Sequence, residues 1–127
     1  MIFTWCTPVY QRHYPQTEIQ HASALKIDVA CNERFSFQVV MRLEAEERLR
    51  VRVDIEGPDG WPITVRRVGY VPVRHLNTPT MTSALDVEGA GAVPGYGPDP
   101  LFEQNDWLLP TGENPPLLVT VSPPPTL

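Results

Sequence analysis

Lysine is almost missing from this chain, and both lysine and arginine are missing from residues 75–127. All ten basic side chains, nine of them arginine, lie between Arg12 and Arg74. Residues 75–127 carry six acidic side chains and no basic one. We therefore expect no nucleic-acid partner, because phosphate binding needs clustered basic residues. We interpret the base-free half as a segment that docks on another surface rather than as a second domain.

Cysteine and metal-binding motifs are also scarce. The chain has only Cys6 and Cys31, far below the density of a disulfide scaffold. Two interpretations stay open, one bridge or two buried free thiols. The histidines are scattered with no ligand-like spacing, at His13, His21 and His75. The sequence therefore predicts no metal site and no cofactor.

Long apolar runs are missing too. No apolar stretch approaches the roughly 18 residues of a membrane span, so we expect no membrane partner. The opening run, residues 1–6, is apolar but has no basic flank, which argues against a secretory signal. We expect a cytoplasmic protein, unless a targeting segment lies outside this sequence.

Proline, by contrast, is abundant and favours an all-β fold. The fifteen prolines remove backbone donors and break helix interiors. The length of 127 residues fits one domain with a real core. We predict a single antiparallel β-sandwich over residues 1–127, with a strand-rich core (1–74), an acidic, proline-rich docking loop (75–116) and a last strand (117–122).

Period-two alternation of apolar and polar residues locates the strands. Leu25–Cys31 and Phe35–Met41 flank the turn residues 32–34 and predict a hairpin. Gly69 and Pro72 indicate a bulge or an edge. The remaining predicted strands are Ile2–Cys6, Leu49–Glu56, Ile63–Arg66 and Val68–Val73 as one long strand or two short ones, and Leu117–Ser122.

The last predicted strand runs into three consecutive prolines, Pro123–Pro125. A β-sandwich that ends in this way usually has a further strand to come. We therefore expect either an exposed edge at residues 117–122 or a polypeptide that continues beyond this sequence. An exposed edge would allow self-association into a homo-oligomer.

Candidate binding residues lie in a stiff, proline-flanked stretch and among the aromatic side chains. Prolines hold the neighbours of Asp99 extended, and glycines permit a close approach. Such a loop contacts a sugar or a partner domain, or simply caps the sandwich. Trp61 follows a turn and is expected to be exposed, whereas Trp107 precedes two leucines and is expected to pack. The predicted binding or docking residues are Trp61, Tyr96, Pro98, Asp99, Pro100, Leu101 and Trp107.

No catalytic motif in the sequence is specific enough to predict an activity. Asp99 could be paired with Glu103 or Asp106 as a glycosidase carboxylate pair, but any acidic loop permits that pairing. There is no Gly-x-Ser-x-Gly elbow, and the close glycine pairs lie in an acidic stretch with no following helix. We predict no catalytic residue.

Three landmarks, taken in order, resemble one bacterial module. They are Ala30, Asn32 and Glu33 followed by Ser36-Phe37-Gln38-Val39-Val40, then Arg67–Val73, then Tyr96–Leu101. Over about residues 1–122 the chain is similar to the N-terminal β-sandwich of glycoside hydrolase family 123 and its uncharacterised relatives. In that family a (β/α)8 barrel follows and carries the acid pair that hydrolyses N-acetylhexosaminides.

The resemblance implies a noncatalytic accessory domain that braces or docks onto such a barrel, which this sequence does not contain. The partner would be the barrel domain or a separate chain. Two alternatives stay open, a stand-alone carbohydrate-binding module that holds a glycan and a small self-associating structural protein.

Overall fold

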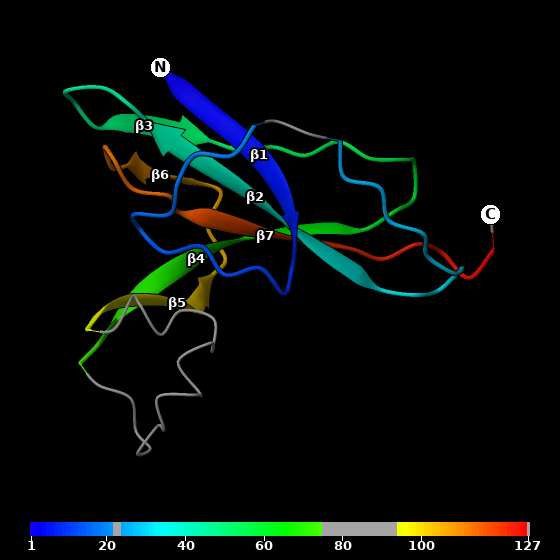
Figure 1. Cartoon of the computed structure of the whole chain (residues 1–127). Helices are drawn as coiled ribbons and strands as arrows, with labels where there is room; N and C mark the ends of the chain where they lie inside the picture. The colour runs from blue at the N-terminus through cyan, green and yellow to red at the C-terminus, as the bar shows by residue number, and fades with distance from the viewer. Residues whose placement is uncertain (22–23, 75–93, 127) are drawn as a thin grey trace, which may run out of the picture.

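The computed structural model describes residues 1–21, 24–74 and 94–126, and none of these residues is helical. Five strands form one antiparallel sheet in the order β1-β2-β7-β4-β5, and β3 and β6 form a second, two-stranded sheet (Figure 1). This confirms the predicted all-β, antiparallel class. The strands are β1 (Ile2–Pro8), β2 (Phe35–Leu43), β3 (Leu49–Arg52), β4 (Ile63–Val73), β5 (Gly95–Phe102), β6 (Asp106–Leu109) and β7 (Pro116–Val121).

One apolar cluster joins the two sheets. Met41 and Leu43 of β2 and Leu117 of β7 meet Trp107 and Leu109 of β6, and Leu109 and Leu117 are fully buried. Every second residue of a strand faces the same side, so these β2 positions point toward the small sheet while Gln38 and Val40 point away from it. The larger sheet is therefore covered by the smaller one on one face.

The chain between β1 and β2 covers part of the opposite face. Trp5 lies opposite Val40 in the β1–β2 register, and its indole meets the His13 ring edge to face, with centroids 6.3 Å apart. Both side chains of this ring pair are buried. The segment after β1 thus packs His13 against Trp5 on this face, and none of its described residues forms a strand.

The predicted hairpin of residues 25–41 is wrong. Residues 24–30 form no strand, and β2 pairs with β1 and β7 instead. The turn itself exists, since Asn32 has a left-handed φ of 62° and the Glu33 carboxylate accepts a hydrogen bond from the Ala30 amide (2.8 Å). Alternation marks a possible strand, but a strand also needs a partner edge, and both edges of β2 are taken.

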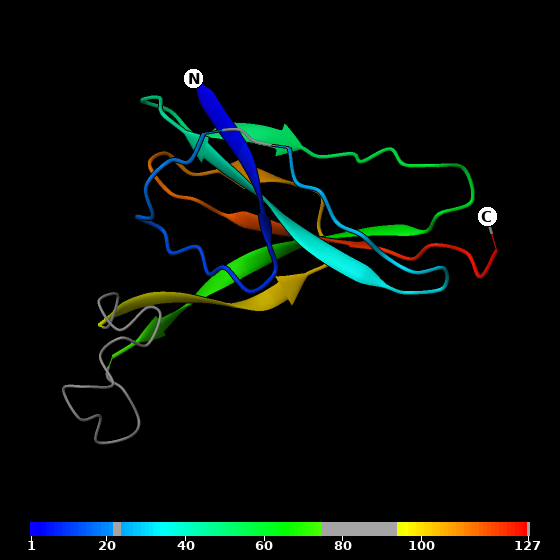
Figure 2. The ribbon, with the colours of Figure 1, turned by 45° about the vertical axis from the view of Figure 1, so that its right-hand side comes forward.

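The 24–34 segment instead meets the end of the chain. The Asn32 amide donates to the Pro124 carbonyl (3.1 Å), and the Ser122 amide donates to the Pro62 carbonyl (3.0 Å). Residues 122–126 therefore lie with two loops at one end of the molecule, whereas β5 begins at the other end (Figures 1 and 2).

The predicted exposed edge at residues 117–122 is also wrong. β7 lies in the middle of the sheet, paired with β2 on one side and β4 on the other. Leu117 and Val119 are fully buried. The backbone groups that were expected to recruit a second copy are thus used within the chain, and the edges of this sheet are β1 and β5.

The predicted docking loop contains two strands. Its residues 75–93 lie outside the described part of the chain, but β5 and β6 form within the remainder. Opposite β4, the register shifts between Val68 and Tyr70, which pair with Leu101 and Pro98, so the extra residue lies on β5. The irregularity lies opposite Gly69, but the extra residue is on β5 and not on the strand for which a bulge or an edge was predicted. It explains how β5 holds two prolines, because prolines fit edge strands and bulges.

Two further expectations need adjustment. Both cysteines are free, with Cys6 half-buried and Cys31 exposed, so the bridge is wrong and burial holds only in part. The predicted strand over residues 49–56 is shorter, because β3 ends at Arg52 where its partner β6 begins. β4 is one continuous strand, which was one of the two alternatives left open for residues 63–73.

Candidate functional site

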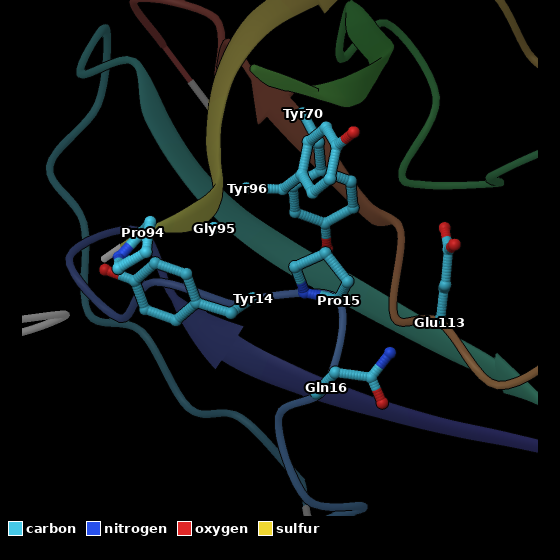
Figure 3. Close-up of a pocket in the computed structure, with 8 residues that line it drawn as sticks. All are labelled: Tyr14, Pro15, Gln16, Tyr70, Pro94, Gly95, Tyr96 and Glu113. Carbon is cyan, nitrogen blue, oxygen red and sulfur yellow. The ribbon is translucent and has the colours of Figure 1, made fainter. Parts of the chain in front are cut away.

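A pocket of about 510 Å³ lies beside the start of β5 and is lined mainly by tyrosine and proline. Four segments build it: the β1–β2 connection, β4, the start of β5 and the β6–β7 connection. Its volume falls within the range of small-molecule sites. The lining residues are Tyr14, Pro15, Gln16, Tyr70, Pro94, Gly95, Tyr96 and Glu113 (Figure 3).

Buried amides hold the β1–β2 connection against the sheet. The Gln38 side chain of β2 donates to the carbonyls of Pro8 (3.0 Å) and Gln11 (2.6 Å). The Asn114 side chain donates to the carbonyls of Tyr14 (3.4 Å) and Thr17. Because both amides are buried, these bonds satisfy carbonyls that water would otherwise have to reach, and they fix where Tyr14 lies.

The Tyr70 side chain, on β4, connects the β1–β2 connection with the β6–β7 connection. Its hydroxyl lies within hydrogen-bonding distance of the His13 carbonyl (3.1 Å) and the Asn114 carbonyl (2.5 Å), which share its proton. Burial, and then the negative charge of Glu113, raise the pKa of Tyr70 far above its ordinary value. The hydroxyl therefore stays a neutral donor, and the ring forms a fixed wall of the pocket.

Thr7 and His13 complete the attachment from the other side. The Thr7 hydroxyl and His13 Nε2 are 2.7 Å apart, and both side chains are buried. The residues immediately before Tyr14 are thus tied to β1. The pocket wall made by residues 14–16 is anchored to β1, to β2 and to the β6–β7 connection.

The composition of the pocket resembles that of a ligand-binding site. Among the described lining residues, Glu113 is the only acid. Tyrosine faces and proline rings supply apolar surface, while Gln16 and Glu113 supply polar groups at its border (Figure 3). Apolar walls with a few oriented polar groups are the usual make-up of ligand sites.

Of the predicted binding residues, only Tyr96 lines this pocket, and it is 58% exposed. Pro98, Asp99, Pro100 and Leu101 lie further along β5, at and next to the bulge.

The two predicted tryptophans lie elsewhere. Trp61 is half-buried in the turn before β4, where its amide donates to the Pro58 carbonyl (3.1 Å). Trp107 is 8% exposed and belongs to the core cluster, as its expected packing required. Neither indole is among the residues lining the tyrosine pocket.

The acids considered as a catalytic pair have other roles. Asp106 accepts from Arg50 (2.5 Å) across β3 and β6, and Glu103 lies 3.5 Å from Arg66. Asp99 is exposed at the β5 bulge. Asp106 and Glu103 thus take part in surface ion pairs between neighbouring segments rather than in a shared site.

Tyr14 and Glu113 are among the pocket residues that were not predicted from the sequence. Tyr14 falls in a turn-rich stretch and Glu113 in a short connection, and no spacing links them. The nearest signal is the Tyr14-Pro15 pair, an aromatic ring next to a stiff residue as in residues 94–98. Only the folded sheet brings these two stretches together.

Two searches of the described residues for other kinds of site were negative. Residues 1–21, 24–74 and 94–126 contain no group of three or more His, Cys, Asp or Glu side chains that could hold a metal ion. Within the same residues no helix is long and apolar enough to cross a membrane.

Comparison with protein-family models found no match to this chain, and comparison with curated proteins found none either.

Proposed function

We propose that this chain is a noncatalytic carbohydrate-binding β module whose tyrosine-lined pocket holds a sugar ring. The observation that supports it is the convergence of Tyr14, Tyr70 and Tyr96 around one hollow, with Gln16 and Glu113 at its border. A pyranose has apolar C–H faces and a polar edge of hydroxyl groups. Aromatic faces match the first, and amide and carboxylate groups match the second.

The pocket is also held in place before any ligand arrives. Tyr70 and the Tyr14 backbone are hydrogen-bonded to buried partners on other segments. A preformed wall lowers the entropic cost of binding, because fewer side chains have to be ordered by the ligand. This favours recognition of a small rigid unit such as a sugar ring.

Isothermal titration against a panel of neutral oligosaccharides tests the proposal. We expect binding by the wild-type chain, and a loss of about tenfold, about 1.4 kcal/mol, in Tyr96→Ala. The matched control is Tyr10→Ala, which removes a tyrosine that is 78% exposed and outside the pocket. A flat response to the whole panel would overturn the proposal, as would an equal loss in the control.

The second proposal is that this module is an accessory domain of a glycoside hydrolase-like protein that docks on a catalytic barrel. It is supported by apolar exposure at the end of the edge strand β5, where Leu101 is 48% and Phe102 is 43% exposed. Leu101 ends the Tyr96–Leu101 landmark that resembles the family module, and Phe102 follows it. The mass of the native protein in its source cell, compared with 14.3 kDa for this chain, tests it. A species of that mass with no bound partner would contradict it.

A further inference from the structure

We propose that the tyrosine pocket prefers a sugar that carries a protonated amine over the neutral, N-acetylated form of the same sugar. The inference rests on the proposed carbohydrate function and names its ligand class. Of the eight lining residues, Glu113 is the only one with a charge, and three others are tyrosines. A carboxylate and several aromatic faces around one hollow are the groups that recognise an ammonium ion.

The first step concerns the charge of Glu113 and whether it is already neutralised. Among the described residues, no ion pair joins Glu113 to an arginine. Glu113 lines the tyrosine pocket, and its negative charge lies close enough to Tyr70 to help raise the pKa of that hydroxyl. A cationic ligand would therefore gain an attraction that a neutral one lacks.

The second step concerns the arginines nearby. Arg48, Arg50 and Arg67 line a neighbouring hollow that Glu113 also borders. Arg50 is directed to Asp106, while Arg67 donates to Gln104 (3.1 Å) and lies 4.6 Å from the centre of the Phe102 ring. Arg48 is exposed and does not line the tyrosine pocket. The ammonium group would thus meet one acid and no base among the described lining residues.

The third step concerns the tyrosine rings. The face of an aromatic ring is the negative side of its quadrupole and attracts a cation placed over it. Tyr14, Tyr70 and Tyr96 border the same hollow and come from three different segments (Figure 3). An acidic sugar would be disfavoured for the same two reasons that favour an amine.

The test compares a glucosamine trisaccharide with its fully N-acetylated form by isothermal titration at about pH 6, where an ordinary amine is protonated. We expect the amine form to bind about tenfold more tightly to the wild type. Glu113→Gln should bring the ratio close to one. Glu103→Gln is the matched control, since Glu103 is 82% exposed and outside the pocket, and it should keep the wild-type ratio.

Salt supplies a second measurement that does not depend on how well Glu113→Gln folds. Raising the ionic strength to about 1 M shortens the screening length to about 3 Å, so the wild-type ratio should shrink. Equal affinities for the two trisaccharides, or a ratio that survives both Glu113→Gln and high salt, would overturn the inference and leave sugar binding intact. If neither trisaccharide binds, the inference is overturned. If no neutral oligosaccharide of the panel binds either, the proposed function is overturned as well.

Discussion

At the scale of single residues, a few buried polar side chains determine where the pocket lies. Gln38, with 7% of its surface exposed, and Asn114, with none, turn their amides toward carbonyls of the β1–β2 connection. In the sequence Gln38 alternates with apolar neighbours. This pattern predicts only that its side chain points to the opposite face of the strand from theirs. That it bonds a covering segment could not be predicted, because the partner carbonyls are more than 25 residues away.

Asn114→Ala tests the role of this amide. The change leaves the partly buried carbonyls of Tyr14 and Thr17 without their donor, so we expect the free energy of unfolding in urea to fall by about 1–3 kcal/mol. Asn105→Ala is the control, because Asn105 is exposed and should cost less than about 0.5 kcal/mol. Equal effects of the two changes would contradict the role given to Asn114.

Tyr70 makes a prediction about alkaline pH. Its pKa is raised in the folded state above the ordinary value of 10.0, chiefly by burial and then by Glu113. The folded state therefore keeps the proton that the unfolded state loses, so this contribution is complete below about pH 10 and is lost as the pH rises further. We expect the unfolding free energy to fall by up to about 1.4 kcal/mol per pH unit above pH 10.

Tyr70→Phe should remove this part of the alkaline slope, measured by urea unfolding between about pH 9 and pH 11. Tyr10→Phe, at a tyrosine that is 78% exposed, should leave the slope as it is. An unchanged slope in Tyr70→Phe would show that the hydroxyl is not held as described.

At the scale of elements, the bulge opposite Gly69 determines how β5 pairs with β4. A Cβ at Gly69 would lie 2.6 Å from Cε2 of Phe102 and 3.0 Å from Cγ of Pro100, both on β5. Gly69 predicted a bulge or an edge on its own strand, whereas the strand opposite it was not predicted, because two prolines and two glycines within residues 95–100 hide the strand pattern. An edge position tolerates those residues, and edge positions cannot be read from local sequence.

Gly69→Ala should therefore push β5 away from β4. The Phe102 ring is partly exposed and can turn aside, whereas the Pro100 ring is rigid, so we expect a loss of about 1–3 kcal/mol in stability. Gly97→Ala is the matched control on β5, where a Cβ would meet only Val73 Cγ2 at an ordinary 3.6 Å. A loss in the control as large as that in Gly69→Ala would contradict the close approach of the two strands.

At the scale of the whole molecule, the fold class was accessible from the sequence and the strand order was not. Proline content and period-two alternation give an all-β chain, and five of the predicted strand regions do hold strands. Alternation says which residues share a face, but not which strands are neighbours. For that reason β7, predicted at an edge, lies in the centre, and residues 25–31 have the pattern of a strand without a partner.

The candidate site, too, could be predicted from the sequence only in part. Tyr96 was found because it lies in a conspicuous proline and glycine stretch, whereas Tyr70 lies within a predicted strand and was not among the predicted binding residues. Tyr14 and Glu113 join them only because the β1–β2 and β6–β7 connections are brought to the start of β5. A site assembled from four separate segments leaves no spacing in the sequence.

The most direct test of the account is a titration of the ¹⁵N-labelled chain with a neutral trisaccharide, followed by amide chemical shifts. Binding in the tyrosine pocket predicts that the signals of Tyr14, Gln16, Tyr70, Tyr96 and Glu113 move together and saturate with one affinity. Shifts confined to Trp61 and to residues 99–101, or no shifts at saturating sugar, would contradict the claim that this pocket binds carbohydrate.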